Sequence, residues 1–539
     1  MNTVYSEFYN ATSAYFDNPF LHIPKQATAA YQQGPVDLTY NETLDQVSVY
    51  SARYAGAGYG LGQRVALVLE NRAAFFLHFL ALNRLGVSIV PINAEHPHES
   101  IAHIISHSDS CLIVTLPEHK KKLDTSINSV GREIAVMETD RFEHIPHAGI
   151  EPHSGVPDKS TEAALLYTSG TTGYPKGCIL SNEYFLTIGD WYVNLGCYCE
   201  LESGRERLIT PLPLVHMNAL CTSTMGMIMS GGCVIQLDRF HAGNWWETVR
   251  AAKATCAHFL GVMPAILLNI PGSPADDFHK QVKFGLCSGT DPKHHEKFEK
   301  RFGFPLIEGW AMTETGTVTA IIAQHEPRYI GTRCIGKPSK NMEYRLLDEE
   351  GKDVNSGEPG ELLVRATGEN PRRGFFSGYL KNAEETEKVW KGGWFHTGDV
   401  MRVNEDGYLQ FVDRRKNIIR RSGENISAVE VEAVLFQNAM VANCAVTPVY
   451  DELRGEEVSA CIILSENVPA GQETAEKIFT FCKDRMIYYK VPGYYLFLSE
   501  LPISATQKIQ RGEVKKLAGV LVENNECTDL RKLKVRNPR

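Results

Sequence analysis

The sequence predicts an α/β protein with three parts: a large N-terminal domain of parallel sheets covered by helices, a β-rich subdomain, and a small α+β C-terminal domain. The observations behind this are a strand–helix–strand pattern over residues 65–91, its recurrence along the first four hundred residues, and a change of composition after about Lys340. Alternating strands and helices are typical of a parallel sheet covered by helices. A chain of 539 residues is also long enough for more than one domain.

The strand–helix–strand pattern begins with a short β-rich run, Val65 to Leu69, and a second run follows at Val87 to Pro91. Between them, Ala73 to Leu82 is apolar over a helical length that is too short to span a bilayer. Gly86 stands where a helix needs its C-cap. This order requires a parallel strand pair and a right-handed crossover. The runs "CLIVTL", "CVIQL" and "HFLGV" predict further buried strands.

The composition indicates a β-rich subdomain after Lys340, where "GEPGELLVRATG" and "DGYLQFVDRR" place turn residues beside short strands. Helix and strand patterns return after "DRRKNIIRRSGEN", over a length that can fold alone. We place the boundary near Asp413 to Lys416. The predicted domains are residues 1–413 and residues 414–539.

The net charge and the cysteine pattern exclude several classes of protein. A net charge of −9 argues against a nucleic-acid binder, and the basic end "RKLKVRNPR" is interpreted as a solvated tail. Thirteen scattered cysteines form no disulfide or zinc pattern, which is typical of reduced thiols. The first twenty residues lack the features of a signal peptide. We therefore expect a soluble, cytoplasmic protein without stable membrane insertion.

The stretch "LLYTSGTTGYPKGCIL", residues 165–180, contains six hydroxyl side chains, three glycines and one lysine between apolar runs. Glycines let backbone N–H groups approach phosphate, and hydroxyls add donors without positive charge. The order suggests strand, loop, helix. It is not a Walker A loop, because Tyr174 and Pro175 separate Gly173 from Lys176. The earlier "GAGYGLG" precedes its strand and is interpreted as a loop.

The segment "YTSGTTGYPKG" resembles the phosphate loop of the adenylate-forming superfamily, which includes acyl-CoA synthetases, luciferases and peptide-synthetase adenylation domains. Four downstream segments resemble the other motifs of that superfamily in the same order, so the resemblance spans about Leu38 to Arg511. It implies an ATP-binding loop made of Thr168, Ser169, Gly170, Thr171, Thr172, Gly173 and Lys176.

The segment "EGWAMTE", residues 308–314, resembles the superfamily's Y-G-x-T-E motif. The resemblance implies that Trp310 stacks on adenine, that Thr313 contacts the α-phosphate, and that Glu314 holds Mg²⁺, with Thr168 as a second metal contact. An aromatic face suits a base, and a carboxylate suits a hard cation. Trp310 replaces the usual tyrosine and Ala311 a glycine, which predicts a tighter pocket. The implied nucleotide site also includes Ser288, Gly289, Thr290, Glu308, Gly309, Ala311 and Met312.

Two further segments extend the resemblance toward the domain boundary. "GGWFHTGD" makes Asp399 the residue that accepts hydrogen bonds from the ribose hydroxyls; alone, this aspartate would more often be a turn residue. "DRRKNIIRRSGENIS" resembles the hinge motif, with Arg414 on ribose and Lys416 at the pivot. Asn417 and Ser422 stand where an acidic residue and a glycine are common, so we expect altered hinge energetics. The implied CoA-side residues are Lys416, Ser422, Gly423 and Glu424.

"LPISATQKIQR" resembles the terminal catalytic motif and makes Lys508 the catalytic lysine. Gln507 replaces its usual preceding glycine, which adds a backbone cost if the position needs positive φ. A cation about 4 Å from a developing charge is worth roughly 4 kcal/mol at an effective dielectric of about 20, before desolvation. The single loop lysine, Lys176, would assist the departing phosphates, whereas a cluster of cations would retain pyrophosphate.

The resemblance implies an AMP-forming acid–CoA ligase that uses ATP, Mg²⁺ and coenzyme A, and "LPLVHMNALCTSTM" is most similar to the crotonobetaine/carnitine–CoA ligase type. Ligases for aryl acids, stand-alone enzymes that load a carrier protein, luciferase-like oxygenases and a silent nucleotide sensor remain alternatives. The oligomeric state is open, and a homodimer is compatible with the superfamily. His216 either gates the acyl pocket, as one of the catalytic candidates, or is a packed histidine. The implied acyl pocket contains His216, Met217, Asn218, Val262, Met263 and Leu286.

Replacement of the implied catalytic lysine should separate two half-reactions. Lys508→Ala should abolish adenylation, because the cation that joins the carboxylate to the α-phosphate is lost. Thioester formation from pre-made acyl-adenylate should largely survive, because the superfamily removes this lysine from the site for the second step. Each half-reaction is measured separately, and an equal loss of both would contradict the alternating role.

Overall fold

We describe the chain from a computed structural model, which covers residues 2–168, 175–290, 292–348, 350–414, 418–502, 509 and 511–534. The chain divides into two compact units. The first contains Met1–Ala94, Ala102–Tyr167 and Gly177–Asp413. The second contains Arg414–Arg539 with the short segments Glu95–Ile101 and Thr168–Lys176. Each unit is described by itself.

The predicted βαβ unit is confirmed near the N-terminus. Strand β3 leads into helix α4 and then to β4, which pairs with β3 in parallel. Gly86 has φ +74°, the left-handed conformation that terminates a helix, and this is why a glycine stands there. The sheet around this unit runs β18-β8-β7-β4-β3-β5-β6, with bounds Gly378–Tyr379, Lys176–Ser181, Glu162–Thr168, Ser88–Pro91, Arg64–Val68, Leu112–Thr115 and Ala135–Glu138.

A second sheet carries most of the residues predicted for the site. Its central strands, including the predicted "CVIQL" and "HFLGV" runs, pair in parallel, whereas β14 and β2 are antiparallel to their neighbours. The order is β14-β13-β12-β11-β9-β10-β1-β2. The bounds are Gly316–Ile322, Leu306–Met312, Phe284–Ser288, Cys256–Leu260, Arg207–Thr210, Cys233–Gln236, Pro19–Ile23 and Val36–Thr39.

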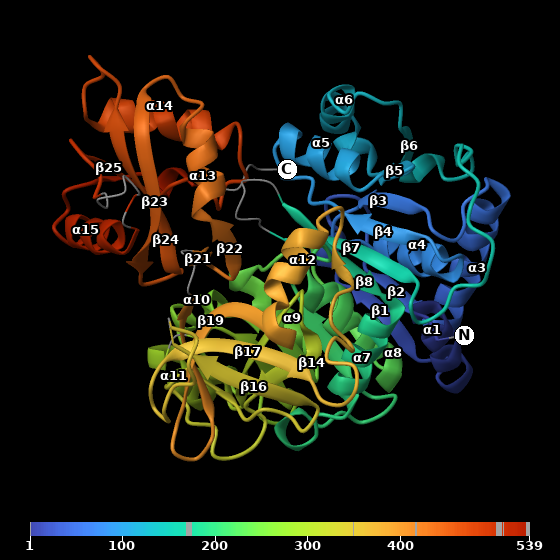
Figure 1. The fold of residues 1–539 in the computed structure, drawn as a ribbon. Helices are drawn as coiled ribbons and strands as arrows, with labels where there is room; N and C mark the ends of the chain where they lie inside the picture. The colour runs from blue at the N-terminus through green and yellow to red at the C-terminus, as the bar shows by residue number, and fades with distance from the viewer. Residues whose placement is uncertain are drawn as a thin grey trace. The chain divides into compact units, whose positions relative to one another are not determined.

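The predicted β-rich subdomain is an antiparallel sheet in the order β15-β20-β19-β17-β16 (Figure 1). Strand β19 alternates buried and half-buried side chains along most of its length, and turn residues such as Gly357 and Gly407, both with positive φ, join strands of this sheet. This sheet places Asp399 in the middle of β19. The bounds are Cys334–Gly336, Leu409–Arg414, Phe395–Val403, Gly360–Ala366 and Met342–Leu347.

Helices pack on both faces of the sheets in the first unit, as the α/β prediction requires. Helix α3 begins with a capping box, in which Thr39 and Glu42 bond each other's backbone N–H groups. Within the described residues no helix is both long and apolar enough to cross a bilayer. The bounds of α1 to α12 are Val4–Ala14, Lys25–Thr28, Tyr40–Gly56, Ala73–Arg84, His98–His107, Lys120–Asn128, Asn182–Val193, Thr224–Ser230, Trp245–Ala251, Val262–Leu268, Pro292–Phe302 and Ala383–Val389.

One local expectation was wrong. The hydroxyl-rich loop does not lead directly into a helix, because strand β8 begins at Lys176 and helix α7 starts only at Asn182. Ser181 caps α7 by accepting from the Tyr184 backbone N–H. The apolar run "GCIL" therefore forms a buried strand of the first sheet, which four apolar residues alone do not distinguish from a helix.

The C-terminal unit is the predicted small α+β structure. Strands β23 and β24 form a long antiparallel pair beside β25, and apolar side chains of α13 and α14 pack against them. The sheet runs β22-β21-β24-β25-β26, with β23 also on β24. The bounds of β21 to β26 are Ile418–Arg421, Glu424–Ser427, Val441–Asp451, Gly455–Leu464, Tyr494–Phe497 and Thr528–Asp529; those of α13 to α15 are Ala428–Leu435, Gln472–Lys483 and Arg511–Glu523.

The expectation of a solvated basic tail is wrong for Lys534. Its side chain is fully buried and its ammonium contacts the Glu457 carboxylate, to which Arg421 also donates at 2.8 Å. Burial, reinforced by the Arg421 charge, lowers the pKa of Lys534 to about 7, although Glu457 opposes the change. The basic composition alone could not reveal this partner.

Loss of this buried ammonium should change how stability depends on pH. Between pH 7 and about 10.5 the unfolded chain holds the Lys534 proton that the folded chain releases, so folding stability gains with rising pH. The gain is at most about 1.4 kcal/mol per pH unit. Urea unfolding at pH 7, 8 and 9 should show this slope in the wild type and not in Lys534→Met.

Lys532→Met is the matched control, because Lys532 is an exposed lysine two residues earlier. It should keep the wild-type pH dependence. Parallel stability curves for the wild type and Lys534→Met would show that Lys534 does not titrate in this window.

Candidate active site

The candidate site lies at one edge of the second sheet. Strands β9, β11, β12 and β13 are parallel neighbours, so their carboxyl ends meet there. The segments that follow these ends contain His216, Gly261, Gly289 and the β13–β14 turn. In open α/β sheets, ligands bind outside the carboxyl ends of the strands. Of the residues that the sequence assigned to nucleotide and acyl group, those around His216, Gly289 and the β13–β14 turn are therefore brought to one edge.

Hydrogen bonds of backbone and side-chain groups hold the ends of β11, β12 and β13 together. Gly261 N donates to Ser288 O at 3.1 Å, and Ser288 Oγ donates to Gly309 O at 2.8 Å. The buried Glu308 carboxylate accepts from the backbone N–H groups of Gly289 and Thr290. Burial raises the pKa of Glu308, and these donors oppose the change. Glu308 thus fixes the turn after β12, and a nucleotide-binding role for these residues stays a prediction.

The hairpin turn between β13 and β14 holds Thr313 and Glu314. Tyr184 of α7 donates its hydroxyl to Thr313 O at 2.8 Å, and Tyr379 of β18 donates to Glu314 Oε1 at 3.0 Å. Burial, and after it the Glu314 charge, raise the pKa of Tyr379, so the phenol keeps its proton. Because β18 pairs with β8, Tyr379 connects Glu314 to the strand that begins at Lys176.

A single carboxylate of this kind fits Mg²⁺. Glu314 offers hard oxygen atoms, is 9% exposed, and is held in one orientation by Tyr379. Mg²⁺ is commonly bound by one or two carboxylates together with substrate phosphates. Among the described residues no group of three or more histidine, cysteine or acidic side chains is arranged for a metal, so a closed all-protein site is not found in that part of the chain.

Trp310 and Asp399 lie in direct contact although they are far apart in sequence. The Trp310 indole Nε1 donates to Asp399 Oδ2 at 2.8 Å, and the side chains are 5% and 0% exposed. An indole presents an N–H in the ring plane that a tyrosine in its place would lack. The predicted adenine and ribose contacts are thus joined by one hydrogen bond. Ala311, the other departure, is exposed beside them.

The acyl-pocket candidates lie around the same edge. His216 is exposed, Met217 and Asn218 are half-buried, and Asn218 begins a π-helix, Asn218–Ser223. Met263 and Leu286 are buried, and the Leu260 N–H contacts Met263 Sδ at 3.4 Å. The side chain of Val262 lies outside the described part of the chain. The structure thus places Asn218 in contact with His258 of β11, and contact of His216–Asn218 with an acyl group stays a prediction.

Sequence reasoning missed four polar residues that support this edge: Asn71, Tyr184, His258 and Tyr379. Asn71 is buried after β3, donates to Leu212 O at 3.1 Å and Leu237 O at 2.8 Å, and accepts from Leu214 N. It thereby fixes the loop that leads to His216. A polar residue directly after a buried strand was the available signal for Asn71. The two tyrosines and His258 stand in apolar runs that gave no such signal.

Several predicted residues lie outside the described residues: Ser169, Gly170, Thr171, Thr172, Gly173, Lys416 and Lys508. Thr168 ends β7 and Lys176 begins β8, so both flank the predicted phosphate loop. Arg414 ends β20, and its side chain is likewise outside the description.

The predicted hinge-side loop turns at Ser422 and Gly423. Their φ angles are +52° and +84°, and Glu424 begins β22. A non-glycine residue in the left-handed region carries a backbone cost of about 1–2 kcal/mol. Serine at position 422 therefore carries a backbone cost that glycine would avoid, and altered hinge energetics stay a prediction.

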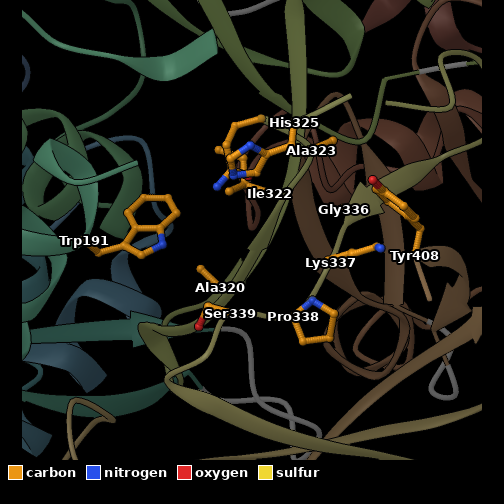
Figure 2. A pocket seen from close by; sticks show the side chains of 11 residues that line it. Trp191, Ala320, Ile322, Ala323, His325, Gly336, Lys337, Pro338, Ser339 and Tyr408 are labelled. Carbon is orange, nitrogen blue, oxygen red and sulfur yellow. The ribbon is translucent and has the colours of Figure 1, made fainter. Parts of the chain in front are cut away.

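The structure also contains a cavity of about 300 Å³ on the α7 face of β14 (Figure 2). Trp191 of α7 lies across from Ile322, and Lys337 and Tyr408 line another wall. The Lys337 ammonium stands 4.5 Å from the centroid of the Tyr408 ring. None of the residues that line this cavity belongs to the predicted site.

Comparisons with known proteins place the chain in a family. The family described as AMP-binding enzyme matches residues 22–380, and its C-terminal domain, AMP-binding enzyme C-terminal domain, matches residues 430–508. Relatives include crotonobetaine/carnitine–CoA ligases of Citrobacter koseri, 29% identical over 493 residues, and of Escherichia coli O9:H4, 27% identical over 491 residues. Each match covers 88% of this chain and 93% of the relative.

Solved structures share the fold. The o-succinylbenzoate CoA synthetase of Bacillus subtilis is 23% identical with a TM-score of 0.80, over 95% of this chain and 98% of that one. An amide bond synthetase of Marinactinospora thermotolerans is 23% identical with a TM-score of 0.79, over 95% and 99%. A malonyl-CoA ligase with methylmalonyl-CoA and AMP bound is 24% identical with a TM-score of 0.74, over 90% and 97%.

A methyl group at Gly261 should disturb the nucleotide side of this edge. A Cβ at Gly261 would stand 1.9 Å from Gly289 O, so the turn after β12 must shift. Overpacking of this kind costs about 1–3 kcal/mol, which corresponds to a loss of roughly tenfold in affinity if it falls on the bound state. Gly261→Ala should weaken AMP binding by about that factor in isothermal titration calorimetry.

Gly272→Ala is the matched control, because a Cβ there has no neighbour within 4 Å. It should bind AMP as the wild type does. Wild-type affinity in Gly261→Ala would mean that the position of Gly289 does not matter for the nucleotide.

Proposed function

Because the chain belongs to the AMP-binding enzyme family of adenylate-forming ligases, we propose that it is an ATP-dependent acid–CoA ligase, releases AMP and acts on a small or medium carboxylic acid. The acid is activated as an acyl-adenylate and then transferred to coenzyme A. Acid–CoA ligases are among its relatives over most of their length, which supports this choice.

The observation that carries the proposal is the Trp310–Asp399 contact beside Glu314. An aromatic side chain and a carboxylate at 2.8 Å suit the adenine and the ribose hydroxyls of one nucleoside. Glu314 lies four residues after Trp310, on the hairpin turn, where a metal on the phosphates would be held. The β7–β8 connection, between Thr168 and Lys176, supplies the remaining phosphate contacts in this proposal.

In the first half-reaction a carboxylate oxygen attacks the α-phosphorus of ATP, and pyrophosphate leaves. Thr313 contacts the α-phosphate, and Lys176 faces the departing phosphates. Bound at Glu314, Mg²⁺ would supply charge neutralisation on the phosphate oxygens. Tyr379 orients Glu314, and Glu308 holds the Gly289–Thr290 turn beside the nucleotide. Lys508 contributes the cation between carboxylate and phosphate.

In the second half-reaction the thiol of coenzyme A attacks the acyl carbon and loses its proton, and AMP leaves. We assign residues 1–413 to nucleotide and acyl binding and residues 414–539 to a lid. Movement of the lid about Lys416 replaces Lys508 by the loop of Ser422, Gly423 and Glu424 on the CoA side. The positive φ angles of Ser422 and Gly423 make a tight turn that presents the backbone there.

We place the enzyme in the cytoplasm. All thirteen cysteines are free, and ten of them are buried, which fits a compartment that keeps thiols reduced. Burial raises the pKa of most of these thiols, for example that of Cys461 to about 12, so they are poor nucleophiles.

The proposal is tested with purified protein by exchange of labelled pyrophosphate into ATP over a panel of organic acids. At least one acid should support exchange, because adenylate formation is reversible on the enzyme. AMP release with that acid should then increase on addition of coenzyme A, and acyl-CoA should form in equal amount. Glu314→Gln, which keeps the size of the side chain, should lower exchange by at least about 100-fold if the carboxylate holds the metal.

Other outcomes identify other functions. Exchange without acyl-CoA formation, together with transfer to an amine or a carrier protein, would replace the CoA ligase by a different adenylating enzyme. Production of ADP, or no exchange with any acid, would contradict the proposed chemistry itself.

A further inference from the structure

A buried histidine that the proposed mechanism does not use lies beneath the acyl side of the site. His258 is on β11, two residues before its carboxyl end, and is 0% exposed. Its Nε2 lies 2.8 Å from the Tyr192 hydroxyl of α7. Its Nδ1 lies 2.7 Å from Asn218 Oδ1 and 2.9 Å from Ser223 Oγ, both on the π-helix. One imidazole thus connects three elements that meet at the site.

The hydrogen-bond pattern decides which nitrogen carries the proton. Burial lowers the pKa of His258 to about 3 and raises that of Tyr192, so the imidazole is neutral and the phenol protonated. The Tyr192 hydroxyl has no partner besides His258 in the described part of the chain, so it donates to Nε2. Nδ1 then carries the hydrogen and donates to the oxygen of Asn218.

The π-helix gives this contact its geometry. Its hydrogen bonds join residues five apart, which brings Asn218 and Ser223 to the same face. Ser223 Oγ donates to Asn218 O at 3.1 Å and so closes the turn. Because Asn218 Oδ1 accepts the hydrogen bond from His258, the Asn218 side-chain N–H groups do not bond the imidazole. Asn218 is half-buried, and its Nδ2 has no hydrogen-bond partner among the described residues.

Given the ligase function proposed above, on which this inference rests, we propose that His258 is a positioning residue. It fixes the Asn218 amide as a hydrogen-bond donor toward the acyl chain. The selected acid therefore carries an acceptor oxygen, such as a hydroxyl, a keto group or a second carboxylate, besides the carboxylate that is activated.

The chemistry of the surroundings favours such an acid over two alternatives. A plain alkyl chain would cover the Asn218 N–H groups without bonding them, and an unpaired buried donor costs free energy. A trimethylammonium group has no acceptor and carries a positive charge that an amide hydrogen repels. None of the other acyl-pocket candidates offers a carboxylate to such a cation; they are His216, Met217, Val262, Met263 and Leu286.

The test uses pairs of acids that differ by one acceptor. The pairs are 4-oxopentanoate with 4-methylpentanoate, 3-hydroxybutanoate with 3-methylbutanoate, and 4-hydroxybenzoate with 4-methylbenzoate. Pyrophosphate exchange gives kcat/KM for each acid with the purified full-length protein. In at least one pair the wild type should prefer the acceptor-bearing acid by about tenfold or more.

Two variants connect this preference to the hydrogen-bond network. Asn218→Leu keeps the branched shape of the side chain and removes the amide, so the ratio of kcat/KM values within the pair should fall toward one. Tyr192→Phe removes only the hydroxyl that fixes His258, and should lower the ratio by a smaller factor. Tyr54→Phe is the matched control, because Tyr54 contacts buried His78 at 2.8 Å and none of the residues of this site. It should leave the ratio unchanged.

Equal use of both acids in all three pairs by the wild type would overturn the inference and leave the ligase function intact, since exchange itself would be observed. A wild-type ratio in Asn218→Leu would overturn it as well. No exchange with any acid would instead refute the ligase function, and the inference with it.

Discussion

The structure depends on one constraint, the parallel pairing of β9, β11, β12 and β13. Parallel neighbours require crossover connections of fixed hand, so successive strands deliver their carboxyl ends to the same edge of the sheet. His216, Gly261 and Gly289 are separated by tens of residues along the chain, yet each follows one of these ends. The site is therefore a consequence of topology first, and of individual side chains second.

Buried polar contacts then give the edge a single geometry. Glu308 holds the turn after β12, Tyr379 orients Glu314, and Trp310 bonds Asp399 of a different sheet. Each of these partners is buried, and in such surroundings a polar group left without its partner is costly. The contacts therefore specify one arrangement of the three sheets' loops. A nucleotide would meet donors and acceptors that are already oriented, which lowers the reorganisation needed for catalysis.

The proposed acyl side is built in the same way but with neutral groups. His258, Tyr192 and Asn218 form a hydrogen-bonded chain without net charge, since burial keeps the imidazole neutral. Such a chain orients an amide without attracting counter-charges, so it is suited to selecting a neutral or anionic acyl group. The carboxylates of Glu314 and Asp399 lie instead among the residues proposed for the nucleotide.

The sequence by itself determined the α/β class, the βαβ unit at β3–β4 and the order of the motifs, because hydrophobic period and glycine positions are local properties. It also singled out Trp310, Glu314 and Asp399 by resemblance. It gave no sign that Trp310 bonds Asp399, that Lys534 is buried against Glu457, or that β8 is a strand. Nor did it single out His258 or Asn71. Only the tertiary structure decided these points, because each partner of a buried polar group is distant in sequence, and no local pattern identifies it.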